Sequence, residues 1–167
     1  MTEIRNDIVE ELIDDSTSTA EKLSRNQTAI KAINILLKKD PEFCVPTPLQ
    51  QQNILVAFAY SGLVLYGRAY DIIKCDRAIN LDSLEDIRKN IDKITIFEIK
   101  STSREMSEDF AGYFFALTTA ELLVAQNLKD RYKFIFVNTK TERYIELTLK
   151  EIFEHAKSIY PTWSIRF

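Results

Sequence analysis

The sequence predicts an α/β fold in which a mixed central sheet is flanked by helices, with an N-terminal helical extension. Segments with helical spacing of apolar residues are interleaved with short apolar segments that suit strands. One of these strands, 94–102, begins apolar on both faces, as is typical of a strand covered on both sides in the middle of a sheet. Several of the helical segments also begin with residues at N-capping spacing.

The composition predicts one globular domain. The chain has 167 residues, of which 46% are hydrophobic and 28% are charged, and it contains only three glycines and four prolines. No apolar run approaches the ~20 residues that a membrane helix needs, and the N-terminus lacks the regions of a signal peptide. We therefore expect a cytoplasmic protein without a membrane partner. The net charge of −3 argues against tight nonspecific binding of nucleic acid but leaves local phosphate contacts open.

The cysteines and the single histidine limit the metal chemistry. Cys44 and Cys75 lie far apart in the sequence, without a C-x-x-C motif, so we expect two buried free thiols in a reducing compartment. A single histidine, His155, excludes a histidine-rich zinc site, and its spacing predicts a core or boundary position. Any metal would need oxygen ligands, which favours Mg²⁺ or Mn²⁺.

Residues 1–45 are predicted to form the N-terminal helical extension, and residues 46–167 the core of the domain. An amphipathic helix is expected over 4–15. A second helix follows from a cap at Ser18 to about Lys39, shortly before a proline. The pattern leaves open whether this extension is a dimer arm, a DNA-facing element or a lid.

The core is expected to begin with a buried helix capped by Thr47 and ended by Gly62. Two antiparallel strands should follow, over 63–66 and 68–77. On the second strand, Asp71 shares a face with small and apolar residues, an unfavourable place for a charge. An inserted helix is then predicted over 82–91.

The next strand combines a buried pattern with two charges. Ile94, Ile96, Glu98 and Lys100 share one face of it under the alternation of a strand. A charge on a buried face costs several kcal/mol unless it is paired or binds a metal. Two interpretations remain open: a Glu–Lys pair at a solvated strand end, or a metal-binding carboxylate beside a catalytic lysine.

The remaining segments complete the predicted order of elements. An acidic loop and an extended aromatic segment over 110–117 precede a helix whose capping box is Thr118 and Glu121. A crossover through this helix would place a strand at 134–137 parallel to the Glu98 strand. The last expected elements are a strand at 144–147, a helix capped by Thr148 to about residue 157, and an edge strand at 163–167.

Residues 97–102, Phe-Glu-Ile-Lys-Ser-Thr, resemble the E-x-K strand of the PD-(D/E)XK nuclease superfamily, which has the restriction-endonuclease-like fold. This is the only Asp/Glu-x-Lys triplet in the chain, and it lies within an apolar strand. The predicted order of elements matches the α-β-β-β-α-β core of that fold over roughly residues 47–147.

The resemblance implies a set of catalytic residues. Asp71 and Glu98 would coordinate Mg²⁺, with Mn²⁺ able to substitute, and the backbone carbonyl of Ile99 would be a further ligand. Lys100 would assist the attacking water. Tyr70-Asp71 stands where the family has Pro-Asp, and Asp76 is a rival for the aspartate position, or a solvated residue at a strand end.

Further positions follow from the resemblance and from the basic residues nearby. The family's helix carboxylate falls on amides here, of which Gln52 is an accessory candidate. The other accessory candidates are Ser101, Thr102 and Glu121, the last of which also suits a helix cap. The candidate DNA contacts are Arg68, Lys74, Arg88, Lys89 and Arg104, and those on the inserted helix suit a solvated helix face equally well.

The expected function is a Mg²⁺-dependent endonuclease that hydrolyses DNA, of a restriction, defence or repair type. The alternatives are a catalytically degenerate DNA-binding or subunit-interaction module, and an α/β protein unrelated to nucleases. DNA is the expected partner, with RNA left open. The family's habit also implies a homodimer or a subunit of a larger nucleic-acid-processing complex.

Overall fold

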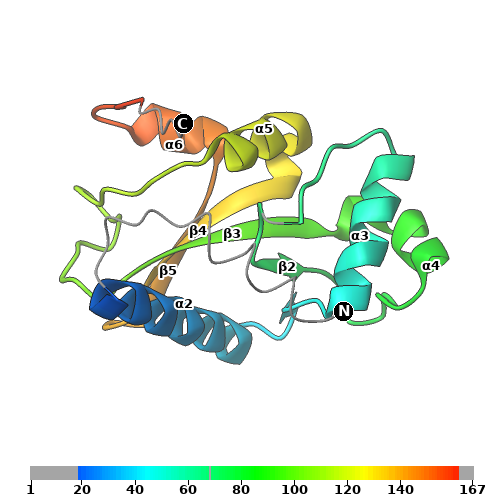
Figure 1. Cartoon of the computed structure of the whole chain (residues 1–167), viewed down its shortest axis with the longest axis horizontal. Helices are drawn as coiled ribbons and strands as arrows, with labels where there is room; N and C mark the ends of the chain where they lie inside the picture. Colours follow the sequence, from blue (N-terminus) through cyan, green and yellow to red (C-terminus); the bar gives the residue numbers. More distant parts are fainter. Residues whose placement is uncertain (1–18, 68, 162–167) are drawn as a thin grey trace.

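The structure is a computed structural model that describes residues 19–67 and 69–161 (Figure 1). A five-stranded sheet in the order β1-β2-β3-β4-β5 lies between helices, which confirms the α/β class and the mixed sheet. The helices are α2 (Thr19–Lys39), α3 (Pro48–Tyr60), α4 (Leu84–Lys89), α5 (Thr119–Leu128) and α6 (Leu149–His155). The strands are β1 (Phe43–Cys44), β2 (Ile72–Lys74), β3 (Thr95–Thr102), β4 (Tyr132–Asn138) and β5 (Arg143–Thr148).

The sheet separates two hydrophobic cores. On one face, α2 packs against residues of β1 to β4, and Leu36 belongs to the same buried cluster as Phe97 and Ile135. The opposite face is covered by α3, α5 and α6, which share the larger core. Figure 1 shows α2 on one side of the sheet and α5 with α6 on the other. Residues 19–44 are thus built into the same fold as the rest of the described chain.

Strand β3 lies at the centre of the sheet. It pairs antiparallel with β2 and parallel with β4, which places Glu98 beside Phe134 and Lys100 beside Phe136. The parallel pairing of β3 and β4 across α5 was predicted from the sequence and is confirmed. The other two pairings, β1 with β2 and β4 with β5, are antiparallel.

Local capping signals located the helices correctly. Thr47, Thr118 and Thr148 each form a capping box at the start of α3, α5 and α6, and Ser83 caps α4. In each case a side-chain oxygen accepts a backbone N–H that the first helical turn leaves without a partner, so the signal is contained within four residues.

Two strand predictions were wrong. Residues 63–66 form no strand, because β1 pairs with β2 at the position where they were expected. The backbone N–H of Val64 instead donates to the side chain of Asn127 at 2.7 Å. In the described chain, the strand predicted over 68–77 is reduced to Ile72–Lys74, the residues that pair with β3.

Some predictions lie outside the described residues: the helix over 4–15, the cap at Ser18, Arg68, and the edge strand at 163–167. His155 is exposed, and its ring lies 2.7 Å from the Glu151 carbonyl, so the predicted core or boundary position was wrong. Its helix ends there, and the core contact of α6 is made by Ile152. Within residues 19–67 and 69–161, no helix has the length and apolar character that crossing a membrane requires.

Candidate active site

The lysine of the E-x-K strand joins two carboxylates. Lys100 Nζ lies 3.0 Å from Glu98 Oε1 on the same strand and 2.9 Å from Glu121 Oε2 on α5. The three side chains are mostly buried, with 13% of Lys100, 13% of Glu98 and 7% of Glu121 exposed. At this burial an unpaired ammonium group would be costly, so Lys100 needs acidic partners to keep its charge inside the fold.

Asp71 contacts the backbone of β3 along the edge that faces β2. Its backbone N–H donates to the Phe97 carbonyl at 2.9 Å, and its Oδ2 accepts the Ile99 N–H at 2.8 Å. The register of β2 with β3 ends at the pair of Ile72 and Phe97, so the Asp71 side chain bonds an edge of β3 that β2 leaves unpaired.

A second contact fixes the segment that carries Asp71. The hydroxyl of Tyr132 on β4 donates to the carbonyl of Ala69, two residues before Asp71. The backbone of the Asp71 segment is therefore bonded to both β3 and β4. This anchoring positions a carboxylate that does not itself belong to a strand.

Asp71 and Glu98 lie close enough to perturb each other. Burial, followed by the negative charge of Asp71, raises the pKa of Glu98 to about 8, although Lys100 opposes the rise. Burial also raises the pKa of Asp71, against the hydrogen bond from Ile99 and the charge of Lys100, and its carboxyl is within hydrogen-bonding range of Glu98. Asp71 is nevertheless exposed to solvent, so a ligand can reach Asp71 and Glu98 from this side.

Lys100 remains a cation in these surroundings. Burial lowers its pKa, but the charges and hydrogen bonds of Glu98 and Glu121 together outweigh the burial, so the pKa lies above the usual value for a lysine. Two acidic partners thus hold the ammonium group in place, and its positive charge acts on groups that lie beside it.

Glu121 has two roles in the structure, and the sequence indicated it both as a helix cap and as an accessory candidate of the site. Its Oε2 accepts the backbone N–H of Thr118 at 3.1 Å, which completes the predicted capping box, and the same oxygen accepts from Lys100. The N-terminus of α5 therefore delivers a carboxylate to the middle of β3. The E-x-K triplet and the capping box were both visible in the sequence, but their contact depends on how α5 packs.

The other accessory candidates take structural roles or lie apart. The Ser101 carbonyl accepts the Tyr113 hydroxyl at 2.8 Å, and Thr102 is buried and bonded to Thr139. Gln52 is exposed on α3 and takes no part in the hydrogen bonds described around Lys100. Asp76, the rival of Asp71, is exposed and accepts the backbone N–H of Ala78 in a turn.

Two basic candidates of the described chain, Lys74 and Lys89, already have acidic partners. Lys74 is the last residue of β2, and its ammonium group pairs with Asp40 at 2.6 Å. On α4, Lys89 pairs with Glu85 at 2.8 Å.

The two predicted arginines that the structure describes are placed differently. Arg88 stacks its guanidinium group 4.5 Å from the centre of the Tyr60 ring. Arg104 is exposed in the loop after β3, where its carbonyl accepts from Asn138. Among the described basic candidates, Arg104 is therefore the one that comes shortly after β3 in the sequence.

Asp71, Glu98 and the Ile99 carbonyl form the oxygen set that suits a divalent cation. Ile99 directs its N–H to Asp71, and a strand residue directs its carbonyl to the same edge, so this carbonyl faces the Asp71 side. In the described chain no three acidic, histidine or cysteine side chains form a metal-binding group. An ion here would therefore need this carbonyl and water besides the two carboxylates, a ligand set typical of Mg²⁺.

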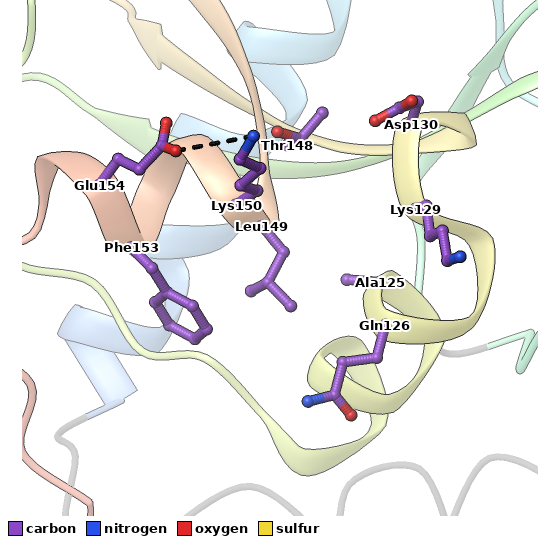
Figure 2. A pocket seen from close by; sticks show the side chains of 9 residues that line it. All are labelled: Ala125, Gln126, Lys129, Asp130, Thr148, Leu149, Lys150, Phe153 and Glu154. Carbon is purple, nitrogen blue, oxygen red and sulfur yellow. Dashed lines mark ion pairs between the residues drawn. The ribbon is translucent and has the colours of Figure 1, made fainter.

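A separate pocket lies between α5 and α6. It has a volume of about 580 Å³, and Figure 2 shows Leu149 and Phe153 of α6 facing Ala125 and Gln126 of α5. Its remaining lining residues are Lys129, Asp130, Thr148, Lys150 and Glu154. None of them is a candidate of the Glu98 site, so this pocket does not belong to it.

No family model matches the chain, and no curated protein or solved structure matches it either. The functional argument therefore depends on the chemistry of the residues around β3.

Proposed function

We propose that the chain is a divalent-cation-dependent endonuclease of the restriction-endonuclease-like type, acting on the phosphodiester bonds of DNA. The observation that carries the proposal is the meeting of Asp71, Glu98 and Lys100 beside one strand. Asp71 bonds the Ile99 N–H at 2.8 Å, and Lys100 lies 3.0 Å from Glu98. These are the residues that the E-x-K resemblance selects, and they come from two separate segments.

The order of elements supports the same proposal. Elements α2, β1, β2, β3, α5 and β4 follow one another in the α-β-β-β-α-β order when α3 and α4 are treated as insertions. This assigns the first helix and first strand of the core to α2 and β1 rather than to the helix at Thr47 and the segment after it. The sheet then has a helix of the core on each face.

The carboxylates suit a Mg²⁺ or Mn²⁺ ion. When bound, such an ion supplies positive charge to a nonbridging phosphate oxygen and lowers the pKa of its water. Asp71 and Glu98 would hold it, with the Ile99 carbonyl as a further oxygen. Because the charge of Asp71 raises the pKa of Glu98, a cation that replaces the proton of Glu98 would relieve the repulsion between the two carboxylates.

Lys100 has the charge and position to assist hydrolysis. Its ammonium group stands beside Glu98, where it would orient the attacking water and stabilise the negative charge that develops on the phosphate. Glu121 holds this group from the opposite element, α5. A lysine fixed by two carboxylates loses little freedom when substrate binds, which favours a positioned catalyst.

The second candidate function is a catalytically degenerate module that binds DNA or another subunit. The observation that favours it is the saturation of the basic groups: Lys100 already pairs with two carboxylates, and Lys74 and Lys89 pair with acidic neighbours. In this interpretation the Lys100 ion pairs only stabilise the buried end of the strand.

Nicking of supercoiled plasmid distinguishes the two functions. With Mg²⁺ or Mn²⁺ we expect the relaxed form to accumulate, and EDTA or Lys100→Ala should abolish it. The matched control is Lys133→Ala, because Lys133 also pairs with a glutamate of the sheet, Glu146, at 3.2 Å. A protein that binds DNA but nicks it with neither metal would support the degenerate module.

A further inference from the structure

The two cysteines of the chain, distant in sequence, meet at the edge of the sheet. Cys44 lies opposite Ile73 in the pairing of β1 with β2, and the Cys75 N–H extends this pairing by donating to the Glu42 carbonyl at 3.1 Å. Cys75 is therefore the diagonal neighbour of Cys44 on the same face. Both contribute to the larger core, and both are free thiols.

The two thiols differ in access and in acidity. Cys75 is buried, with 6% exposed, whereas Cys44 is only half-buried, so the prediction of two buried thiols holds for one of them. The side-chain interaction with Cys75 lowers the pKa of Cys44, while the same interaction, together with burial, raises the pKa of Cys75. Cys44 is therefore the accessible nucleophile, and Cys75 retains its proton.

A buried hydroxyl group belongs to the same core as the two cysteines. Tyr70 is 5% exposed, and its hydroxyl has no hydrogen-bond partner among the described residues. Gln51 lies nearby, but its amide donates to the Gly67 carbonyl at 2.8 Å. Burial raises the pKa of Tyr70, and a charge on Cys44 would raise it further.

We propose that Cys44 and Cys75 form a peroxide-reactive dithiol that closes to a disulfide bond between β1 and β2. The Cys44 thiolate attacks one oxygen of the peroxide; an S–O bond forms, the O–O bond breaks, and hydroxide leaves. Cys75 then attacks the Cys44 sulfur; the S–S bond forms, the S–O bond breaks, and water leaves with the Cys75 proton. Two thiols and one hydrogen peroxide thus give a disulfide and two waters.

The edge position of β1 makes this closure possible. Diagonal neighbours in an antiparallel pair have Cα atoms about 7–8 Å apart, and a disulfide requires about 4.4–6.8 Å, so one strand must shift by about 1 Å. Strand β1 has two residues and pairs with β2 alone, at the end of the sheet. It is the element of the sheet that can make this shift with the fewest broken bonds.

The test uses the full chain, fully reduced and then treated with equimolar hydrogen peroxide. Intact mass spectrometry should show a loss of about 2 Da that dithiothreitol reverses, and digestion should give one peptide pair joined through Cys44 and Cys75. In Cys75→Ala, Cys44 should stop at a sulfenic acid that dimedone traps. In Cys44→Ala, Cys75 should react at least roughly tenfold more slowly than Cys44 does in the wild type.

Other outcomes would overturn the proposal. They are two thiols that stay reduced, a Cys44 oxidised to the sulfinic acid beside an intact Cys75 thiol, and a disulfide found only between molecules. Because the readout is the state of the sulfur atoms, the result does not depend on nuclease activity.

Discussion

Replacing Glu98 by glutamine should remove much of the pH dependence of stability. In the unfolded chain this carboxyl titrates near 4.5, whereas in the fold burial and Asp71 raise its pKa to about 8. The folded protein thus holds a proton that the unfolded chain releases, so the stabilisation is complete below about pH 4.5 and is lost as the pH rises through about 8. A pKa rise from 4.5 to about 8 corresponds to at most about 5 kcal/mol.

The expected loss is smaller than this maximum because the titration of Glu98 depends on the charges of Asp71, Glu121 and Lys100 beside it. We expect the metal-free wild type to lose several kcal/mol between about pH 5 and about pH 9, and Glu98→Gln, whose amide resembles the protonated acid, to lose less than half as much. Urea unfolding followed by far-UV circular dichroism in EDTA measures both.

The matched control is Glu146→Gln, which removes a strand carboxylate that pairs with Lys133 at 3.2 Å. Glu146 lies opposite Ile135, a residue of the α2 face, so its removal should leave the pH dependence of the wild type unchanged. The reasoning is refuted if Glu98→Gln retains the full pH dependence, or if the control loses it to the same extent.

Three further results are expected. Glu121→Gln should keep the helix cap, since glutamine also suits that position. It should reduce plasmid nicking at least roughly tenfold, because the charge beside Lys100 is lost, and unchanged nicking would contradict this. Thr118→Ala should cost about 1 kcal/mol in urea unfolding, and no loss would show that the cap contributes nothing. Mn²⁺ at 100 times its Kd should stabilise the wild type by about 2.7 kcal/mol and Asp71→Asn far less; equal thermal shifts would contradict a site at Asp71.

The helices could be predicted because their signals are local. Thr47, Thr118 and Thr148 each cap a helix through a residue three positions later, so the sequence contains both partners within one turn. The central strand could also be predicted, because its apolar residues on both faces require cover from two layers.

The edge of the sheet could not be predicted, because strand pairing joins distant segments. Residues 63–66 alternate as a strand does: Leu63 and Leu65 pack on the core while Val64 and Tyr66 are exposed. The hydrogen bonds that define a strand went to residues 43–44 instead, and a two-residue strand has too little pattern to be recognised.

The candidate site shows the same division. The sequence selected Asp71, Glu98 and Lys100, and the structure brings them together. Glu121 was an accessory candidate, but its ion pair with Lys100 could not be predicted from the sequence, because that contact depends on the packing of α5 against β3. Nor did the sequence indicate that Cys44 and Cys75 are neighbours, since the register of β1 alone decides that.

The most direct test of the proposed site is a crystal grown with millimolar Mn²⁺ and measured for anomalous scattering. We predict one strong peak beside β3, within about 2.0–2.6 Å of an oxygen of Asp71 and an oxygen of Glu98. A map without a peak between these two carboxylates, in crystals whose side chains are well ordered, would contradict the proposal that they share a cation.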